Sequence, residues 1–127
     1  MSAEGRLRSA AAATRYQKAW FADLRREAEA GTPFALANAD APLEILRAMG
    51  IPYVVNQWWS SIISAKGVSG ASLAAAAARG LPDDSRQYDV LPLGAQELPA
   101  DVAPWGGLPE PRFAIAERSG DVTHKIF

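Results

Sequence analysis

Residues 9–30 carry an apolar stripe with the spacing of one helix face. The stripe consists of Tyr16, Trp20, Phe21, Leu24 and Ala28. Charged side chains such as Arg25 lie largely away from it. Gly31 and Pro33 follow and interrupt the pattern. The spacing therefore predicts an N-terminal amphipathic helix that ends near residue 31.

Two continuous apolar runs, 34–38 and 51–56, have the length and composition of strands that are covered on both faces. The segment between them predicts a short helix, with Leu43, Leu46 and Met49 on one side. Asp40 stands where an N-cap residue belongs, and Gly50 suits the position just after a helix. A strand, a helix and a strand in this order predict a right-handed βαβ unit with parallel strands.

The rest of the chain predicts helices over 58–65 and 70–78 and a third strand over 113–117. Between them, 80–111 contains repeated prolines and no sustained period, which predicts a long wrapping loop that has room for a helical turn. The fold class is therefore α/β, a small parallel sheet with flanking helices that resembles half of a flavodoxin or Rossmann fold. We expect one domain over 1–127, organised as 1–31, 32–79, 80–111 and 112–127, with Asp121 capping the start of a last helix.

Composition limits the classes of function. The 127 residues carry a net charge of −1, so no global field attracts nucleic acid or an anionic membrane. The absence of cysteine excludes thiolate ligation and disulfides, and the single histidine, His124, argues against a histidine-rich metal site. No secretory signal is recognisable, and no apolar run approaches the roughly 20 residues of a membrane helix. We expect a soluble cytoplasmic protein.

Polar residues follow the first two predicted strands, at the edge of the sheet where α/β proteins bind ligands. They are Asn38, Asp40, Asn56, Trp58, Trp59, Ser60 and Ser61. Adjacent tryptophans beside amides and hydroxyls suit an aromatic acyl group or an adenine. Simpler interpretations stay open: Asp40 as a helix cap, and the tryptophans as one core residue and one interface residue.

Three further candidates have equally simple explanations. Glu44 in a first helical turn complements the helix dipole. Asp83 and Asp84 follow Leu81-Pro82 and suit a turn or a cap. A solitary histidine near a terminus, here His124, is usually a surface or interface residue. No glycine-rich phosphate loop is present.

The segment Ala41-Pro42-Leu43-Glu44-Ile45-Leu46-Arg47-Ala48-Met49-Gly50-Ile51-Pro52 resembles a motif near the start of 2-hydroxyacyl-CoA dehydratase D-components, a family that includes the benzoyl-CoA reductase subunits. The order of predicted elements and the later Trp105-Gly106-Gly107-Leu108-Pro109 also fit. The resemblance covers most of this chain but only the N-terminal portion of a usual family subunit.

The resemblance implies an oxygen-sensitive heteromeric lyase or reductase of anaerobic acyl-CoA metabolism. Family members hold a [4Fe–4S] cluster through cysteines and pass one electron to a thioester. This chain departs from the pattern: Ser85 is the nearest candidate to the family's first cluster cysteine, and Asn38-Ala39-Asp40 stands where dehydratases often carry a Cys-Ser pair. A lone serine cannot hold such a cluster.

We therefore expect no cofactor on this chain, a [4Fe–4S] cluster on a cysteine-bearing partner subunit, and an acyl-CoA ligand. Such a chain is not expected to be active alone. Two alternatives stay open: a catalytically silent scaffold subunit of the same kind of complex, and an unrelated small α/β ligand-binding domain.

Overall fold

A computed structural model describes residues 7–81 and 86–118 of the chain. The chain divides into two compact units, 1–32 and 33–127. The first boundary expected from the sequence, at residue 31, lies next to this division. None of the helices described has the length and apolar content needed to span a lipid bilayer.

The first unit is the helix α1 (Arg8–Glu29), as the four-residue spacing predicted. Surface ion pairs one turn apart join Arg25 to Glu29 and Arg26 to Asp23. The predicted apolar stripe contains more residues than α1 actually buries. Its buried members are Phe21 and Leu24, whereas the Tyr16 side chain is 73% exposed. Tyr16 is therefore no core residue.

The second unit begins with the predicted βαβ element: β1 (Ala35–Ala37), α2 (Leu43–Ala48) and β2 (Tyr53–Val55). Gly50 ends α2 with a φ of 66°, a conformation that suits glycine. The capping prediction for Asp40 is wrong. The Ala41 amide donates to the Asn38 carbonyl in a tight turn, so α2 starts late, with Pro42 at its N-cap.

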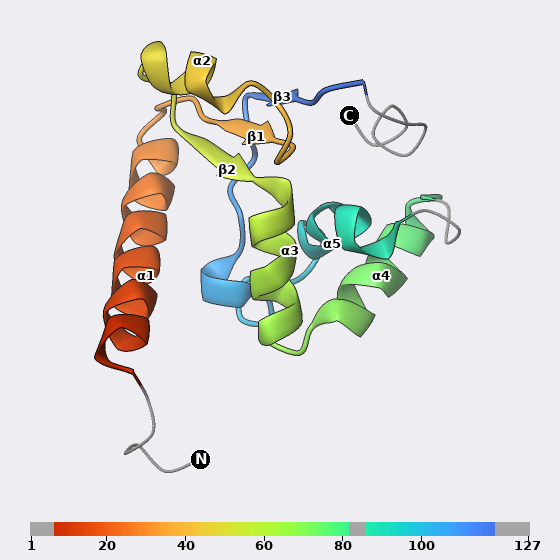
Figure 1. Cartoon of the computed structure of the whole chain (residues 1–127). Coiled ribbons are helices and arrows are strands. Elements are labelled where there is room, and N and C mark those ends of the chain that lie inside the picture. Colours follow the sequence, from red (N-terminus) through yellow and green to blue (C-terminus); the bar gives the residue numbers. More distant parts are fainter. Residues whose placement is uncertain (1–6, 82–85, 119–127) are drawn as a thin grey trace. The chain divides into compact units, whose positions relative to one another are not determined.

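The sheet is three-stranded and parallel within the described residues, in the order β2-β1-β3, with β3 spanning Phe113–Ile115 (Figure 1). Ala37 of the central strand pairs with Val55 on one side and with Ile115 on the other. The small α/β fold expected from the sequence is thus confirmed. The order is that of the first three strands of a flavodoxin-like sheet.

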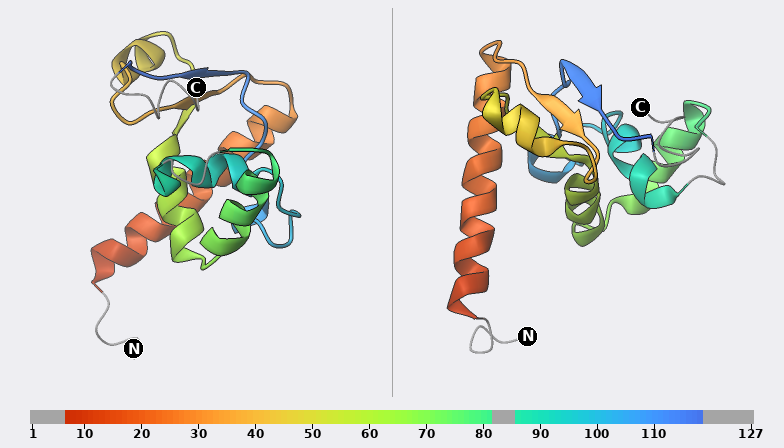
Figure 2. Two further views of the ribbon diagram at one scale, coloured as in Figure 1. Left: turned by 90° about the vertical axis from the view of Figure 1, so that its right-hand side faces the viewer. Right: turned by 45° about the horizontal axis from the view of Figure 1, so that its top comes forward.

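Helices lie on both sides of the sheet, with α2 on one side and α3 to α5 on the other (Figure 2). Beneath α2, a buried cluster contains Ala35, Ala37 and Leu46. Ile115 of β3 and Tyr53 of β2 pack against the same cluster. This apolar layer follows from the strict alternation of side chains along the strands.

The other side begins with α3 (Asn56–Ala65) and α4 (Ser69–Ala78), close to their predicted bounds. The predicted long loop is partly wrong, because it contains the helix α5 (Gln87–Ala95) and the 3₁₀ turn η2 (Pro104–Gly106). Most of α5 is buried, so it lacks the one-sided apolar stripe of a surface helix. Pro92 inside it further disguises the helix in the sequence.

Close backbone contact explains how α5 fits against α4. A Cβ atom added to Gly94 would lie 1.8 Å from the carbonyl oxygen of Ser72. Only glycine therefore allows this approach. Arg79, just after α4, pairs with Glu97, just after α5, at 3.2 Å.

Candidate functional site

Polar residues follow all three strands at their carboxyl ends. Asn38 follows β1, Asn56 follows β2 directly, and Glu117 comes two residues after β3. Because the strands are parallel, these residues gather at one edge of the sheet. The chain leaves β1 toward β2 on one side and returns as β3 on the other, so this edge contains a topological switch point between β1 and β3. Ligands of open α/β sheets bind at such points.

Four side chains form a hydrogen-bonded group at this edge, which we call the polar cluster: Asn38, Gln57, Asp89 and Glu117. The Asn38 Nδ2 donates to Glu117 Oε2 at 2.6 Å, a bond that crosses the switch point. The Gln57 Nε2 donates to Asn38 Oδ1 and to Asp89 Oδ1, the latter at 3.2 Å. Asn38 is 3% exposed and Asp89 is 8% exposed.

A backbone donor completes the polar cluster. The Ala39 amide lies 2.9 Å from Gln57 Oε1 and 2.8 Å from Asn38 Oδ1. Ala39 is exposed, so this donor lies where the cluster meets solvent. The Gln57 carboxamide thus satisfies a donor and two acceptors at once. A ligand that displaced it would need both a carbonyl oxygen and an N–H group, as an amide has.

Charge in the polar cluster is mixed. Asp89 pairs with Arg86 at 3.0 Å, and the Arg86 side chain is 68% exposed. The ion pair therefore places a carboxylate and a solvent-exposed guanidinium side by side at the cluster.

Asn56 and Ser60 lie fully buried under the cluster, on α3. The Asn56 Nδ2 donates to the Asp89 carbonyl at 3.0 Å, and the Ser60 hydroxyl donates to the Tyr88 carbonyl. These bonds hold the first turn of α5, and with it Asp89, against α3. Asn56 Oδ1 has no hydrogen-bond partner among the described residues. Asn56 and Ser60 therefore position the cluster from below.

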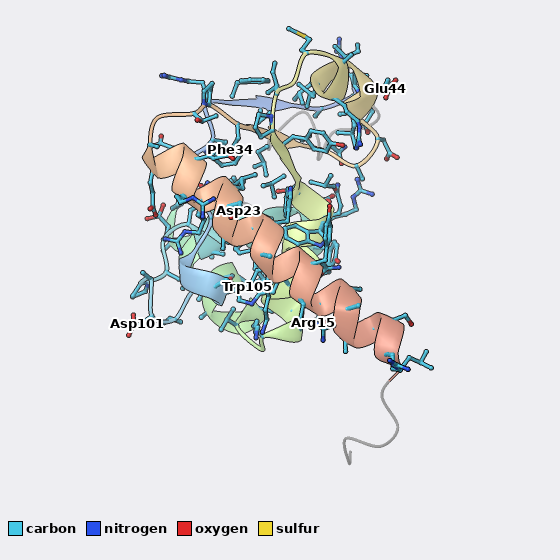
Figure 3. The ribbon with its side chains drawn as sticks, turned by 90° about the vertical axis from the view of Figure 1, so that its left-hand side faces the viewer. Arg15, Asp23, Phe34, Glu44, Asp101 and Trp105 are labelled. Atoms are coloured by element: carbon cyan, nitrogen blue, oxygen red, sulfur yellow. The ribbon has the colours of Figure 1, made fainter. Side chains whose placement is uncertain are left out.

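Three tryptophans pack together farther along α3. The ring centroids of Trp58, Trp59 and Trp105 lie 6.0 to 6.2 Å apart, in tilted arrangements typical of favourable aromatic pairs. Trp105, labelled in Figure 3, has a φ of 51°, an uncommon conformation for a residue other than glycine. Trp59 is 1% exposed and belongs to the core. Trp58 is half-buried.

The structure brings some of the predicted site residues together and separates others. Asn38, Asn56 and Ser60 meet at or under the polar cluster. Asp40 is exposed, and Ser61 is an exposed residue whose hydroxyl donates to the Trp58 carbonyl of its own helix. Glu44 lies exposed in the first turn of α2, a position in which a carboxylate complements the helix dipole (Figure 3).

Other predictions concern residues that the structure does not describe. Asp83, Asp84, Ser85, Asp121 and His124 lie outside the described ranges. Within residues 7–81 and 86–118, no group of three or more acidic or histidine side chains is arranged to hold a metal ion.

Sequence reasoning missed Asp89 and Glu117 and gave Gln57 no role of its own. Asp89 lies in the segment for which the sequence predicts a loop, and no predicted strand end precedes it. The sequence predicts Glu117 as the last residue of the third strand, and its position at a parallel strand end is the same signal that identifies Asn38. That signal could have found it.

Comparison of the chain with models of protein families, with characterised proteins and with solved structures finds no match.

Proposed function

We propose that the 33–127 unit binds an acyl-CoA thioester at the polar cluster, as a subunit of a heteromeric dehydratase or reductase whose partner chain holds a [4Fe–4S] cluster. The observation that carries the proposal is the Asn38–Glu117 hydrogen bond across the switch point. The resemblance of 41–52 to the dehydratase motif supplies the ligand class. In the structure this motif forms α2 and its two connections.

The chemistry of the cluster suits the uncharged part of such a ligand. The pantetheine arm of CoA contains amides, and a thioester presents a carbonyl oxygen. The Ala39 amide donates to the Gln57 carboxamide and could donate to either of these groups instead. Asn38 Oδ1 and Asp89 Oδ1, which accept from Gln57, could accept from an amide N–H.

In this proposal the residues of this chain bind and orient the ligand. The Ala39 N–H would polarise a carbonyl oxygen, and Asn38 and Asp89 would fix the orientation of the neighbouring amide. Asn56 and Ser60 would act as positioning residues, because they hold Asp89 through the backbone of α5. The electron would come from the partner's cluster, since this chain has no cysteine.

A scaffold subunit is the second candidate. It is favoured by the internal pairing of the polar cluster, in which Asn38, Gln57 and Asp89 already have hydrogen-bond partners within the chain. A purely structural network would look the same. The two candidates differ in one property: a scaffold stabilises its partner without contacting the ligand.

Anaerobic co-purification from the native host, followed by iron determination and mass identification of the partners, tests the assembly. The proposal expects an iron-containing complex with a longer, cysteine-bearing chain. A colourless, iron-free monomer would overturn it and leave a small α/β binding domain. Within such a complex, Gln57→Leu separates the two candidates, because Gln57 joins the other members of the polar cluster. Altered acyl-CoA turnover in an intact complex supports ligand binding, whereas dissociation supports the scaffold.

A further inference from the structure

The hydrogen bonds around Gln57 describe the chemical group that fits the polar cluster. The Gln57 Oε1 accepts the Ala39 amide hydrogen at 2.9 Å. The Gln57 Nε2 donates to Asn38 Oδ1 and to Asp89 Oδ1. Both hydrogens of the NH₂ group and the carbonyl oxygen therefore have partners. The surrounding groups form a complete set of partners for one primary carboxamide, C(=O)NH₂.

The direction of these hydrogen bonds is fixed by groups that cannot exchange donor and acceptor. The Ala39 backbone nitrogen is always a donor, and the Asp89 carboxylate is an acceptor. The Asn38 carboxamide is fixed as well, because its Nδ2 donates to Glu117 Oε2 at 2.6 Å and its Oδ1 then faces Gln57. One donor and two acceptors thus point at the Gln57 carboxamide.

The two acceptors are buried and are held in place by other residues. Asn38 and Asp89 are both buried. The Asp89 Oδ2 pairs with Arg86 Nε at 3.0 Å, which leaves Oδ1 for Gln57. The Asn56 Nδ2 donates to the Asp89 carbonyl and fixes the backbone of the same residue. Because a buried acceptor without a donor costs free energy, the cluster requires a group with two N–H bonds.

We infer that the polar cluster is a binding site for a primary carboxamide, in which Gln57 is the internal occupant, and that a ligand ending in this group binds by displacing the Gln57 side chain. The cluster lies at the switch point, where open α/β sheets bind ligands. Ala39 is exposed and Gln57 is half-buried, so the exchange can take place from the solvent side. The exposed Arg86 guanidinium beside Asp89 gives the rest of such a ligand a further contact. The inference does not depend on the acyl-CoA ligand proposed above.

The same set of partners discriminates against related groups. A carboxylate has no hydrogen, so one of its oxygens would face both Asn38 Oδ1 and the Asp89 carboxylate. A secondary amide has one N–H and leaves one of the two acceptors without a donor. The amides of the pantetheine arm are secondary and would use the cluster only in part. A primary carboxamide should therefore bind more tightly than a carboxylate or an N-methyl amide of the same size.

Chemical rescue of the purified chain by small amides tests the inference. Gln57→Gly removes the internal occupant and leaves room for acetamide, which matches the end of a glutamine side chain. We expect about 100 mM acetamide to raise the Tm of Gln57→Gly by at least about 3 °C relative to its effect on Gln96→Gly. Gln96, an exposed glutamine just after α5, provides the matched control. Acetate and N-methylacetamide should shift the Tm by less than about 1 °C. Gln57→Ala with formamide is the second pair if the glycine variant does not fold.

In the unchanged chain acetamide has to compete with Gln57. The amide resonance of Ala39 in an NMR titration should therefore move in both proteins, but the unchanged chain should need at least about tenfold more acetamide than Gln57→Gly. Acetamide binding without acyl-CoA binding would support this inference and remove only the proposed ligand. The inference would be overturned by equal responses to acetate and acetamide, by equal responses of the two proteins, or by an Ala39 resonance that stays unmoved in the unchanged chain up to about 1 M acetamide.

Discussion

The Ser60 hydroxyl on α3 donates a hydrogen bond to the backbone carbonyl of Tyr88 in the first turn of α5. This carbonyl lies four residues before Pro92, whose ring nitrogen carries no hydrogen. The proline thus deprives Tyr88 of its ordinary helical donor, and Ser60 replaces it from the neighbouring helix. Both Ser60 and Pro92 are fully buried, so an unpaired carbonyl here would be costly.

Ser60→Ala should lower the free energy of unfolding by about 1–2 kcal/mol, because it leaves the Tyr88 carbonyl without this donor. In a Pro92→Ala background the new backbone N–H can donate to Tyr88 instead. The same Ser60→Ala change should then cost about 1 kcal/mol less. Urea unfolding of the four proteins in this double-mutant cycle measures the difference. Equal costs in both backgrounds would show that the two residues do not share the carbonyl.

Ser61→Ala is the matched control for this cycle. Ser61 is the next residue of α3, is exposed, and donates to a carbonyl of its own helix. Its loss should change stability by no more than about 0.5 kcal/mol.

Gly94→Ala should destabilise the 33–127 unit by about 3 kcal/mol or more. The added Cβ would lie 1.8 Å from the Ser72 carbonyl oxygen, so α4 and α5 would have to move apart. Gly70→Ala is the control, since a Cβ at Gly70 of α4 meets nothing within 4 Å. It should raise stability by about 0.5–1 kcal/mol, because alanine favours the helix. Thermal unfolding should therefore shift in opposite directions, and a neutral Gly94→Ala would contradict the close packing of α4 and α5.

Asn38→Asp tests the bond across the switch point without changing the size of the side chain. It replaces the Nδ2 donor with a carboxylate oxygen that faces the Glu117 carboxylate. We expect a loss of about 2 kcal/mol in the free energy of unfolding, since a charge-assisted hydrogen bond becomes a repulsion. Asp40→Asn, in the exposed turn that follows, should change stability by less than about 0.5 kcal/mol. Equal losses of unfolding free energy for the two variants would show that the Asn38–Glu117 hydrogen bond does not stabilise the protein.

The parts of the fold that carry a strong local pattern could be predicted from the sequence. The apolar runs at 34–38 and 51–56 predicted β1 and β2, and Gly50 predicted the end of α2. The failures have physical causes. Asp40 does not cap α2, because a turn closed by the Asn38 carbonyl precedes the helix. The helix α5 is buried on most sides, so its sequence shows no one-sided apolar stripe.

The residues of the candidate site that follow strands could be predicted from the sequence, whereas Asp89 could not. Residues that directly follow a strand, such as Asn38 and Asn56, are visible in the sequence. Asp89 joins them only because α5 packs against α3, a long-range contact that no local pattern encodes. For Trp59 the sequence left two interpretations open, a pocket residue or a core residue. Trp59 is buried and therefore belongs to the core.

The most direct test of the proposed function measures acyl-CoA binding to the anaerobically purified complex by equilibrium dialysis, for the unchanged chain and for two glutamine variants. Gln57→Leu removes the side chain that joins Ala39, Asn38 and Asp89, while Gln96→Leu alters an exposed glutamine just after α5. We predict that Gln57→Leu lowers the acyl-CoA Kd by about tenfold, because the ligand no longer has to displace the Gln57 carboxamide, and that Gln96→Leu leaves the Kd unchanged, with both complexes intact. An unchanged Kd for Gln57→Leu would contradict a ligand site at the polar cluster.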